Sequence, residues 1–164
     1  MAQGTTTGTA GSARPTKYHG KQGEWTVICP LKPGGAEQLR ELAKNEQETA
    51  GQAQAIAIGT LHDMRVAIFD NDSRMLFATV FDGAWDQYID DFAAIPETNA
   101  ALDRLFSVCE GFPGMHSPDV KDWFVKHQPD VPFFWTAYPE ATVKQIKKGQ
   151  QVLAGFEQIL DAAG

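Results

Sequence analysis

Ile58–Gly83, IGTLHDMRVAIFDNDSRMLFATVFDG, contains two runs rich in β-branched and aromatic residues, separated by the tetrapeptide Asp70-Asn71-Asp72-Ser73. Asn and Asp side chains bond to nearby backbone groups and tolerate a left-handed φ, so the tetrapeptide predicts a turn. Two strand-like runs around such a turn predict a β-hairpin. The other elements are arranged around this hairpin.

Before the hairpin, Glu24–Leu31 alternates in the manner of a strand, and Pro30 marks the end of that strand or a sheet edge. Pro33-Gly34-Gly35 breaks the chain. The following residues predict an amphipathic helix that gives way to a polar loop at 45–54. The apolar face of this helix consists of Ala36, Leu39, Leu42 and Ala43.

After Gly83 the apolar spacing becomes helical and predicts helices between about 84 and 128. The aromatic-rich run Val131–Tyr138 predicts a fourth strand, which Pro139 ends. A long helix capped by Thr142 follows, and Gly149 on its apolar face indicates a close approach of this helix to the sheet. The side chains predicted to point inward from this helix are Val143, Ile146, Leu153, Phe156, Leu160 and Ala163.

The fold class predicted from this order is α+β: a ferredoxin-like βαββαβ antiparallel sheet with a helical insertion at about 84–128 and a C-terminal helix. Residues 1–22 are rich in Gly, Thr, Ala and Ser and predict a flexible tail, so that 23–164 form a single domain. A sheet with helices on one face leaves the other face bare, and such a face usually needs a partner.

The segments GTLHDMRVAIFD, LFATVFDGAWDQYIDDF and FSVCEGFPG, in this order of elements, resemble the dimeric α/β-barrel superfamily and a bacterial group within it. The resemblance covers residues 24–163. The superfamily includes antibiotic-biosynthesis-type monooxygenases, haem proteins of the chlorite dismutase-like and dye-decolorising-peroxidase-like kinds, and aldoxime dehydratases. The resemblance implies a homodimer whose two sheets enclose a barrel, with a cavity that holds a hydrophobic small molecule or haem.

The composition narrows the choice of partners. The net charge of −7 and the pI of about 5.0 argue against nucleic acid and anionic membranes, because an acidic surface repels phosphate. No apolar run approaches the roughly 18 residues that a membrane span needs. Cys29 and Cys109 lie far apart in apolar runs without metal-type spacing, which predicts buried, reduced thiols and a cytoplasmic protein.

His62 and Arg65 are the candidate catalytic residues, because they lie inside a strand that should be largely buried. His62 would serve as a general base or an axial haem ligand, or else as a structural histidine bonded to a carboxylate such as Asp82. Arg65 would anchor a carboxylate or a haem propionate. Its structural alternative is an ion pair with Asp63, Asp86, Asp90 or Asp91.

These two candidates face a geometric difficulty. His62 and Arg65 point to opposite faces of an ideal strand, so both can serve one site only if a β-bulge intervenes. Gly59 is the expected source of irregularity, but it precedes both residues.

Other polar residues are weaker candidates. His116, in a Gly- and Pro-rich loop, is either a haem ligand or an exposed histidine. His127 lies near the end of a predicted helix, where a positive charge suits the helix dipole. Asp86, Asp90 and Asp91 would bind a cation or form a solvated acidic face.

Aromatic residues on the predicted strands and inserted helices could line an apolar pocket for a flat ligand. The alternative is that they form the core and a dimer interface. These residues are Trp25, Trp123, Phe124, Phe133 and Trp135.

The function expected from these observations is an oxidoreductase that binds a small molecule or haem in its barrel cavity, with His62 and Arg65 at the site. A cofactor-free monooxygenase or isomerase is one alternative. A non-catalytic dimeric binding module, in which His62 and Arg65 are structural, is another, and it would have a filled barrel lumen with no cavity and no bound chromophore. The chain contains no P-loop, GxGxxG or GxSxG motif, which leaves nucleotide-dependent and serine-hydrolase chemistry without support.

Overall fold

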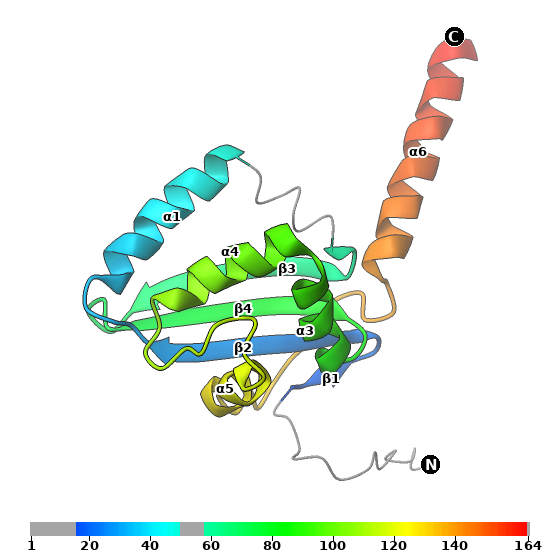
Figure 1. Ribbon diagram of the computed structural model, residues 1–164. Helices are drawn as coiled ribbons and strands as arrows, with labels where there is room; N and C mark the ends of the chain where they lie inside the picture. The colour runs from blue at the N-terminus through cyan, green and yellow to red at the C-terminus, as the bar shows by residue number, and fades with distance from the viewer. Residues whose placement is uncertain (1–15, 50–57, 164) are drawn as a thin grey trace, which may run out of the picture.

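The computed structural model describes residues 16–49 and 58–163 and contains a four-stranded antiparallel sheet. The strands β1 (Tyr18–His19), β2 (Gln22–Pro30), β3 (Leu61–Phe69) and β4 (Arg74–Asp82) lie in the order β1-β2-β4-β3 (Figure 1). Both β2 and β3 run antiparallel to β4, so they are parallel to each other with β4 between them. This α+β arrangement is compatible with a ferredoxin-like fold.

The predicted hairpin is confirmed as β3, β4 and the turn between them. Asp70, Asn71 and Asp72 all have positive φ, at 53°, 53° and 65°. This left-handed region is costly for most residues other than glycine, and Asn and Asp are among those that tolerate it best. Both guanidinium nitrogens of Arg40 donate to the Asp72 carboxylate, at 2.9 and 2.6 Å, and so connect the turn to the first helix.

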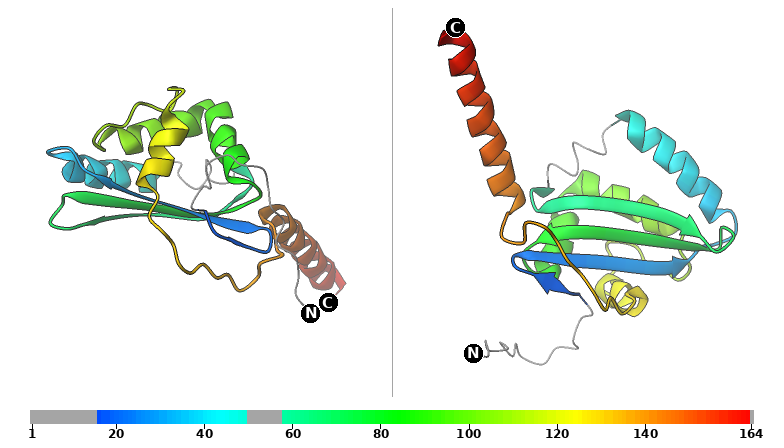
Figure 2. Two further views of the ribbon diagram at one scale, coloured as in Figure 1. Left: turned by 90° about the horizontal axis from the view of Figure 1, so that it is seen from below. Right: turned by 180° about the vertical axis from the view of Figure 1, so that it is seen from behind.

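The helices α1 (Gly35–Thr49), α3 (Trp85–Ala94), α4 (Pro96–Ser107) and α5 (Val120–His127) follow the predicted order. Figure 2 shows α3, α4 and α5 on one face of the sheet. Trp25, which is fully buried, lies at the centre of the core between sheet and helices. Its ring contacts those of Phe77, Trp85, Tyr88, Phe92, Phe106 and Phe124.

The predicted strand Val131–Tyr138 is wrong. Residues 128–142, which we call the strap, are irregular and run past the sheet on the face opposite to the helices (Figure 2). The side chain of Gln22 holds the strap by donating to the carbonyls of Tyr138 and Ala141, at 3.1 and 2.8 Å. The short strand β1 occupies the edge of β2 only at Gln22 and Gly23, but three prolines deprive the strap of N–H donors that pairing with a sheet edge would need.

The predicted boundary of the tail also differs from the structure. The composition predicts a tail at 1–22, but Tyr18–His19 and Gln22 belong to the sheet. The Tyr18 hydroxyl accepts a hydrogen bond from the backbone N–H of Trp85 at 3.0 Å, which joins this segment to the start of α3. Residues 1–15 lie outside the described part of the chain.

The C-terminal helix α6 (Val143–Ala163) begins where the sequence predicts. Gln145 N–H donates to Thr142 Oγ1 at 3.2 Å, while Gln145 Oε1 accepts from Thr142 N–H at 3.0 Å, which is a capping box. The predicted inward packing is wrong: α6 projects away from the sheet, and its apolar residues are exposed (Figure 1). Among the described residues, nothing beyond the neighbouring residues and backbone of α6 itself lies within 4 Å of the position that a Cβ would take at Gly149, so the predicted close approach is absent there.

No helix within residues 16–49 and 58–163 is long and apolar enough to cross a membrane.

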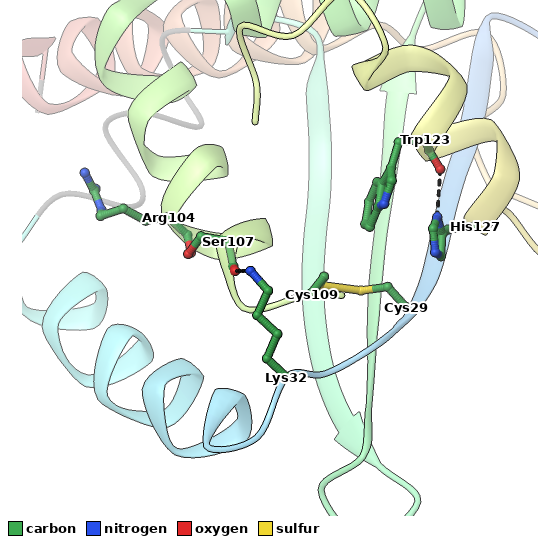
Figure 3. The surroundings of a disulfide bond; sticks show 7 residues. All are labelled: Cys29, Lys32, Arg104, Ser107, Cys109, Trp123 and His127. Atoms are coloured by element: carbon green, nitrogen blue, oxygen red, sulfur yellow. Dashed lines mark hydrogen bonds between the residues drawn. A yellow bond between two sulfur atoms is a disulfide. The ribbon is translucent and has the colours of Figure 1, made fainter. Parts of the chain in front are cut away.

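Cys29 and Cys109 are buried, as predicted, but they are joined in a disulfide (Figure 3). The two Cα atoms are 6.0 Å apart although 80 positions separate the residues in sequence. Leu31 pairs with Cys109 as an isolated bridge, so backbone pairing beyond the end of β2 brings the thiols together. The prediction of reduced thiols is therefore wrong, and the cytoplasmic location inferred from them loses that support.

We expect reduction of this disulfide to destabilise the protein. Cross-linking a loop of this length lowers the entropy of the unfolded chain by an amount worth about 4.5 kcal/mol. Urea denaturation with and without dithiothreitol should show a large fall in the midpoint. The variant with both Cys29→Ala and Cys109→Ala should have the same urea midpoint as the reduced wild type, and dithiothreitol should not change that midpoint. Equal midpoints for the oxidised and the reduced wild type would contradict the expectation.

Candidate functional site

A β-bulge resolves the geometric difficulty with His62 and Arg65. The register of β3 against β4 shifts between Leu61 and Asp63, so His62 is an additional residue in the ladder. Arg65 pairs with Ala78, and His62 bonds to Asp82, two positions of β4 on the face away from the helices. We call this the open face of the sheet. The bulge therefore places both candidates on one face, although Gly59 is not its source.

His62 and Asp82 form a hydrogen-bonded pair. Their Nε2 and Oδ1 atoms are 2.7 Å apart, and the side chains are only 14% and 11% exposed. The backbone N–H of Val143, the first residue of α6, donates to Oδ2 of Asp82 at 2.8 Å. This is the alternative in which His62 is bonded to Asp82, and it leaves Nδ1 of His62 without a partner among the described residues.

The geometry of this pair indicates which nitrogen can accept a proton. An ionised carboxylate only accepts hydrogen bonds, so Nε2 of neutral His62 carries the hydrogen and Nδ1 carries the lone pair. Because a backbone N–H also holds Asp82, the orientation of the imidazole is set by two separate elements, β4 and α6. The arrangement has the form of a histidine base oriented by a carboxylate.

Arg65 forms an ion pair with Asp63 at 2.8 Å, which was one of its predicted alternatives. The two side chains are 64% and 50% exposed, so this pair contributes little to stability. Arg65 is thus an accessible cation on the same face as His62, and an anionic ligand could compete for it.

A cavity of about 690 Å³ adjoins Asp82 at the end of β4, within the size range of ligand pockets. It lies between the start of α3, the start of α6 and the loop before β3. The buried hydroxyl of Thr60 has no hydrogen-bond partner among the described residues. The polar and charged residues that line the cavity are Tyr18, Lys21, Thr60, Asp82, Gln87, Tyr88, Asp91, Thr142 and Lys144.

Tyr88 lines this cavity, but its phenol oxygen is buried. Burial raises its pKa well above the usual value of 10.0, and only 1% of the residue is exposed. Its ring stacks on Phe81 with the centroids 4.2 Å apart, which fixes its position beside the end of β4. The phenol therefore stays protonated at neutral pH, and its buried oxygen has no hydrogen-bond partner among the described residues.

The predicted aromatic pocket does not form as one site. Trp25, Trp123 and Phe124 are buried in the core on the helix side of the sheet, as their structural alternative predicted. Phe133 and Trp135 lie on the strap, on the other side, and are 75% and 71% exposed. The prediction fails because the strap is not a strand of the sheet.

The remaining candidates lie away from His62 and Asp82. His116 is exposed beside a separate cavity of about 370 Å³ lined by Asn99, Asp103 and Arg104. Nδ1 of His127 lies 2.8 Å from the carbonyl of Trp123 (Figure 3). Nζ of Lys121 lies 3.6 Å from Asp86 and 2.6 Å from Asp90, so these carboxylates are paired with a lysine.

The described residues contain no group of three or more His, Cys, Asp or Glu side chains suited to a metal ion.

Several residues of the site were not singled out from the sequence. Tyr88 lies one turn after Trp85 and one turn before Phe92, so helical spacing could have placed it in the buried stripe. Tyr18 and Lys21 were assigned to the tail. Nothing in the sequence signals the bond between Asp82 and Val143, because it joins positions 61 residues apart.

Comparisons with known proteins identify no family for the chain. No protein-family model matches it, and no curated protein matches it. Among solved structures, the chain is similar to a NIPSNAP family protein from Agrobacterium tumefaciens strain C58, with 18% identity and a TM-score of 0.40. The match covers 58% of this chain and 82% of that protein.

We expect Tyr88 to make the protein lose stability in alkali. The unfolded chain releases the phenol proton above about pH 10, while the folded chain retains it. The contribution of Tyr88 to the free energy of unfolding is therefore fully present below pH 10. Above pH 10 it falls by up to about 1.4 kcal/mol per pH unit. Urea unfolding of wild type and Tyr88→Phe between pH 8 and 12 measures the difference, and parallel pH dependences for the two proteins would contradict this expectation.

Proposed function

We propose that this protein is a homodimeric enzyme that binds a small molecule and uses His62 as a general base, as a cofactor-free oxidoreductase or an isomerase. The observation that carries the proposal is the bond between His62 Nε2 and Asp82, with Nδ1 unpartnered among the described residues. A histidine in this arrangement can take a proton from a weakly acidic C–H or O–H group.

The chemistry available after proton removal separates the two reaction types. Returning the proton to another atom of the bound molecule gives isomerisation. Addition of the resulting carbanion to dioxygen forms a C–O bond and reduces the O–O unit to a peroxide, which takes up the proton to give a hydroperoxide of the bound molecule; this is oxygenation. Arg65 supports either reaction by pairing with an anionic group of the ligand, since its exposed partner Asp63 can be displaced.

The homodimer is proposed because the open face is only partly covered. Half-buried apolar residues of β2 and β4 lie on it, among them Ile28, Leu76 and Val80. Packing this face against a second copy would remove apolar surface from water and enclose the space beside His62, as in the dimeric α/β-barrel superfamily. An enclosed site would strengthen the interactions of its charged groups.

Haem does not fit the candidate residues within one copy of the chain. Nε2 of His62 is bonded to Asp82, and the residue does not line the larger cavity. His116 lies at the smaller cavity, and the predicted aromatic residues are divided between the two faces of the sheet. We therefore assign no step of the proposed reaction to haem. A Soret band that develops on titration with hemin and is lost in His62→Ala or His116→Ala would establish haem and name its ligand.

A non-catalytic dimeric binding module is the second candidate. It is favoured by the exposed aromatic residues of the strap, which provide a contact surface, and by the pairing of His62 and Arg65 with carboxylates. In this case the two pairs would only stabilise the fold.

Replacing the proposed base should separate the two candidates. A panel of weakly acidic phenols and 1,3-dicarbonyl compounds is screened for binding, oxygen consumption and isomer formation. For a compound that reacts, His62→Gln should lower kcat by about 10² to 10⁴ with little change in KM. Asp82→Asn should act in the same direction by disturbing the orientation of the imidazole, and Arg65→Gln should raise KM for anionic compounds only.

The matched control is His116→Gln, which makes the same change at the separate cavity and should leave turnover unchanged. Unaltered turnover in His62→Gln would contradict the proposed base. Binding without turnover of any compound by the wild type would favour the binding module.

A further inference from the structure

One row of residues on the open face runs from one edge of the sheet to the other. His19 of β1 pairs with Gln22 of β2, and Gln22 pairs with Asp82 of β4. Asp82 in turn bonds to His62 of β3. Because the strands lie in the order β1-β2-β4-β3, His19 and His62 occupy opposite ends of this row. The strap covers only the first end, where the ring of Trp135 stacks on that of His19 with the centroids 6.2 Å apart.

The other half of the open face has no cover within the described chain. The strap is bonded to β1 and β2 (Figure 2), whereas Asp63, Arg65 and Ala67 of β3 are exposed. The strap itself exposes three large aromatic side chains, by 71% to 77%. These are Phe133, Trp135 and Tyr138. A bare half-face and a raised aromatic segment therefore lie on the same side of the sheet.

These two features restrict how two copies can pack open face to open face about a two-fold axis between their sheets. An axis that runs across the strands places strap over strap, so the two segments collide and both bare halves stay unfilled. An axis that runs along the strands, above the boundary of β2 and β4, exchanges the two edges of the sheet. Each strap then lies over the bare half of the other copy.

The second arrangement brings a particular residue to the candidate site. Rotation about an axis along the strands keeps every residue at its own level along them, so Trp135 of the second copy stays at the level of the row. It moves from the His19 end of one copy to the His62 end of the other. We propose that the homodimer has this arrangement and that Trp135 of the second copy forms an aromatic wall beside His62.

The surface available is enough for a specific pair. Two strands of nine residues, β3 and β4, present an area of about 10 Å by 30 Å, or roughly 300 Å². The three strap aromatics add on the order of 100 Å² each, since a buried aromatic side chain covers more than that. Each copy would bury roughly 600 Å², and the pair about 1,200 Å², which is the lower limit of specific interfaces.

The arrangement also narrows the class of ligand. A tryptophan ring that faces the sheet beside His62 stacks best on a flat, conjugated molecule. The inference rests on the proposed function and limits its substrates to flat ring compounds with a weakly acidic proton. Trp135→Ala should raise KM for such compounds about two- to tenfold, because one ring contact is lost.

Cross-linking between two singly substituted copies tests the arrangement without any substrate. The native Cys29 and Cys109 are buried and joined to each other, so they leave introduced thiols as the reactive ones. Trp135→Cys and Asp63→Cys copies are co-expressed with different tags and treated with a short bismaleimide. The mixed pair should cross-link, whereas Trp135→Cys paired with the control Asp122→Cys, on the helix side, should not.

Three results would overturn the proposal: a monomeric wild type in sedimentation at micromolar concentration, no cross-link in the mixed pair, or an equally strong cross-link in Trp135→Cys alone, which indicates strap over strap. Co-expression of His62→Gln with Trp135→Ala separates this inference from the proposed base. If Trp135 acts on the other copy's site, each mixed dimer has one intact site, and turnover is partly restored. A cross-link in the mixed pair without turnover of any compound by the wild type would support the dimer and contradict the base.

Discussion

The carboxylate of Asp82 is the point on which the described structure of this protein depends most. One oxygen holds His62 at the bulge of β3, and the other accepts the first backbone N–H of α6. Asp82 also lines the larger cavity. A single residue at the end of the central strand therefore connects the hairpin, the cavity and the C-terminal helix. A change in its position would alter the orientation of His62 and the start of α6 together.

The two faces of the sheet are stabilised by different means. Aromatic residues packed around Trp25 bury the helix-side face, with Phe77 and Phe124 among its nearest rings. The open face has no helix layer in the described chain and is crossed only by the strap, held through the backbone carbonyls that Gln22 contacts. Burial of apolar surface contributes a large and non-directional free energy, whereas a few hydrogen bonds can hold a segment in place without covering the surface beneath it. The open face and α6 are consequently the surfaces where contacts with other molecules are expected.

The sequence predicted those elements that depend on residues close to one another in the chain. The turn at Asp70–Ser73, the strand around Trp25 and the capping box at Thr142 follow from residue types within a few positions. For the candidate site, Asp82 was named as a bonding partner of His62, because a half-buried histidine needs a carboxylate nearby. The strand expected at Val131–Tyr138 is absent, since strand formation depends on backbone pairing with another segment as well as on suitable residues, and three prolines interrupt the strap.

The sequence by itself determined the hairpin, the order of most helices and strands, the apolar stripe of α6 and the identity of the polar residues in β3. These depend on side-chain periodicity and turn chemistry, which act over a few residues. Only the tertiary structure decided the bulge that brings His62 and Arg65 to one face, the pairing of Cys29 with Cys109, and the direction in which α6 leaves the body. Those features depend on contacts between segments far apart in the chain, where periodicity carries no information about which groups meet.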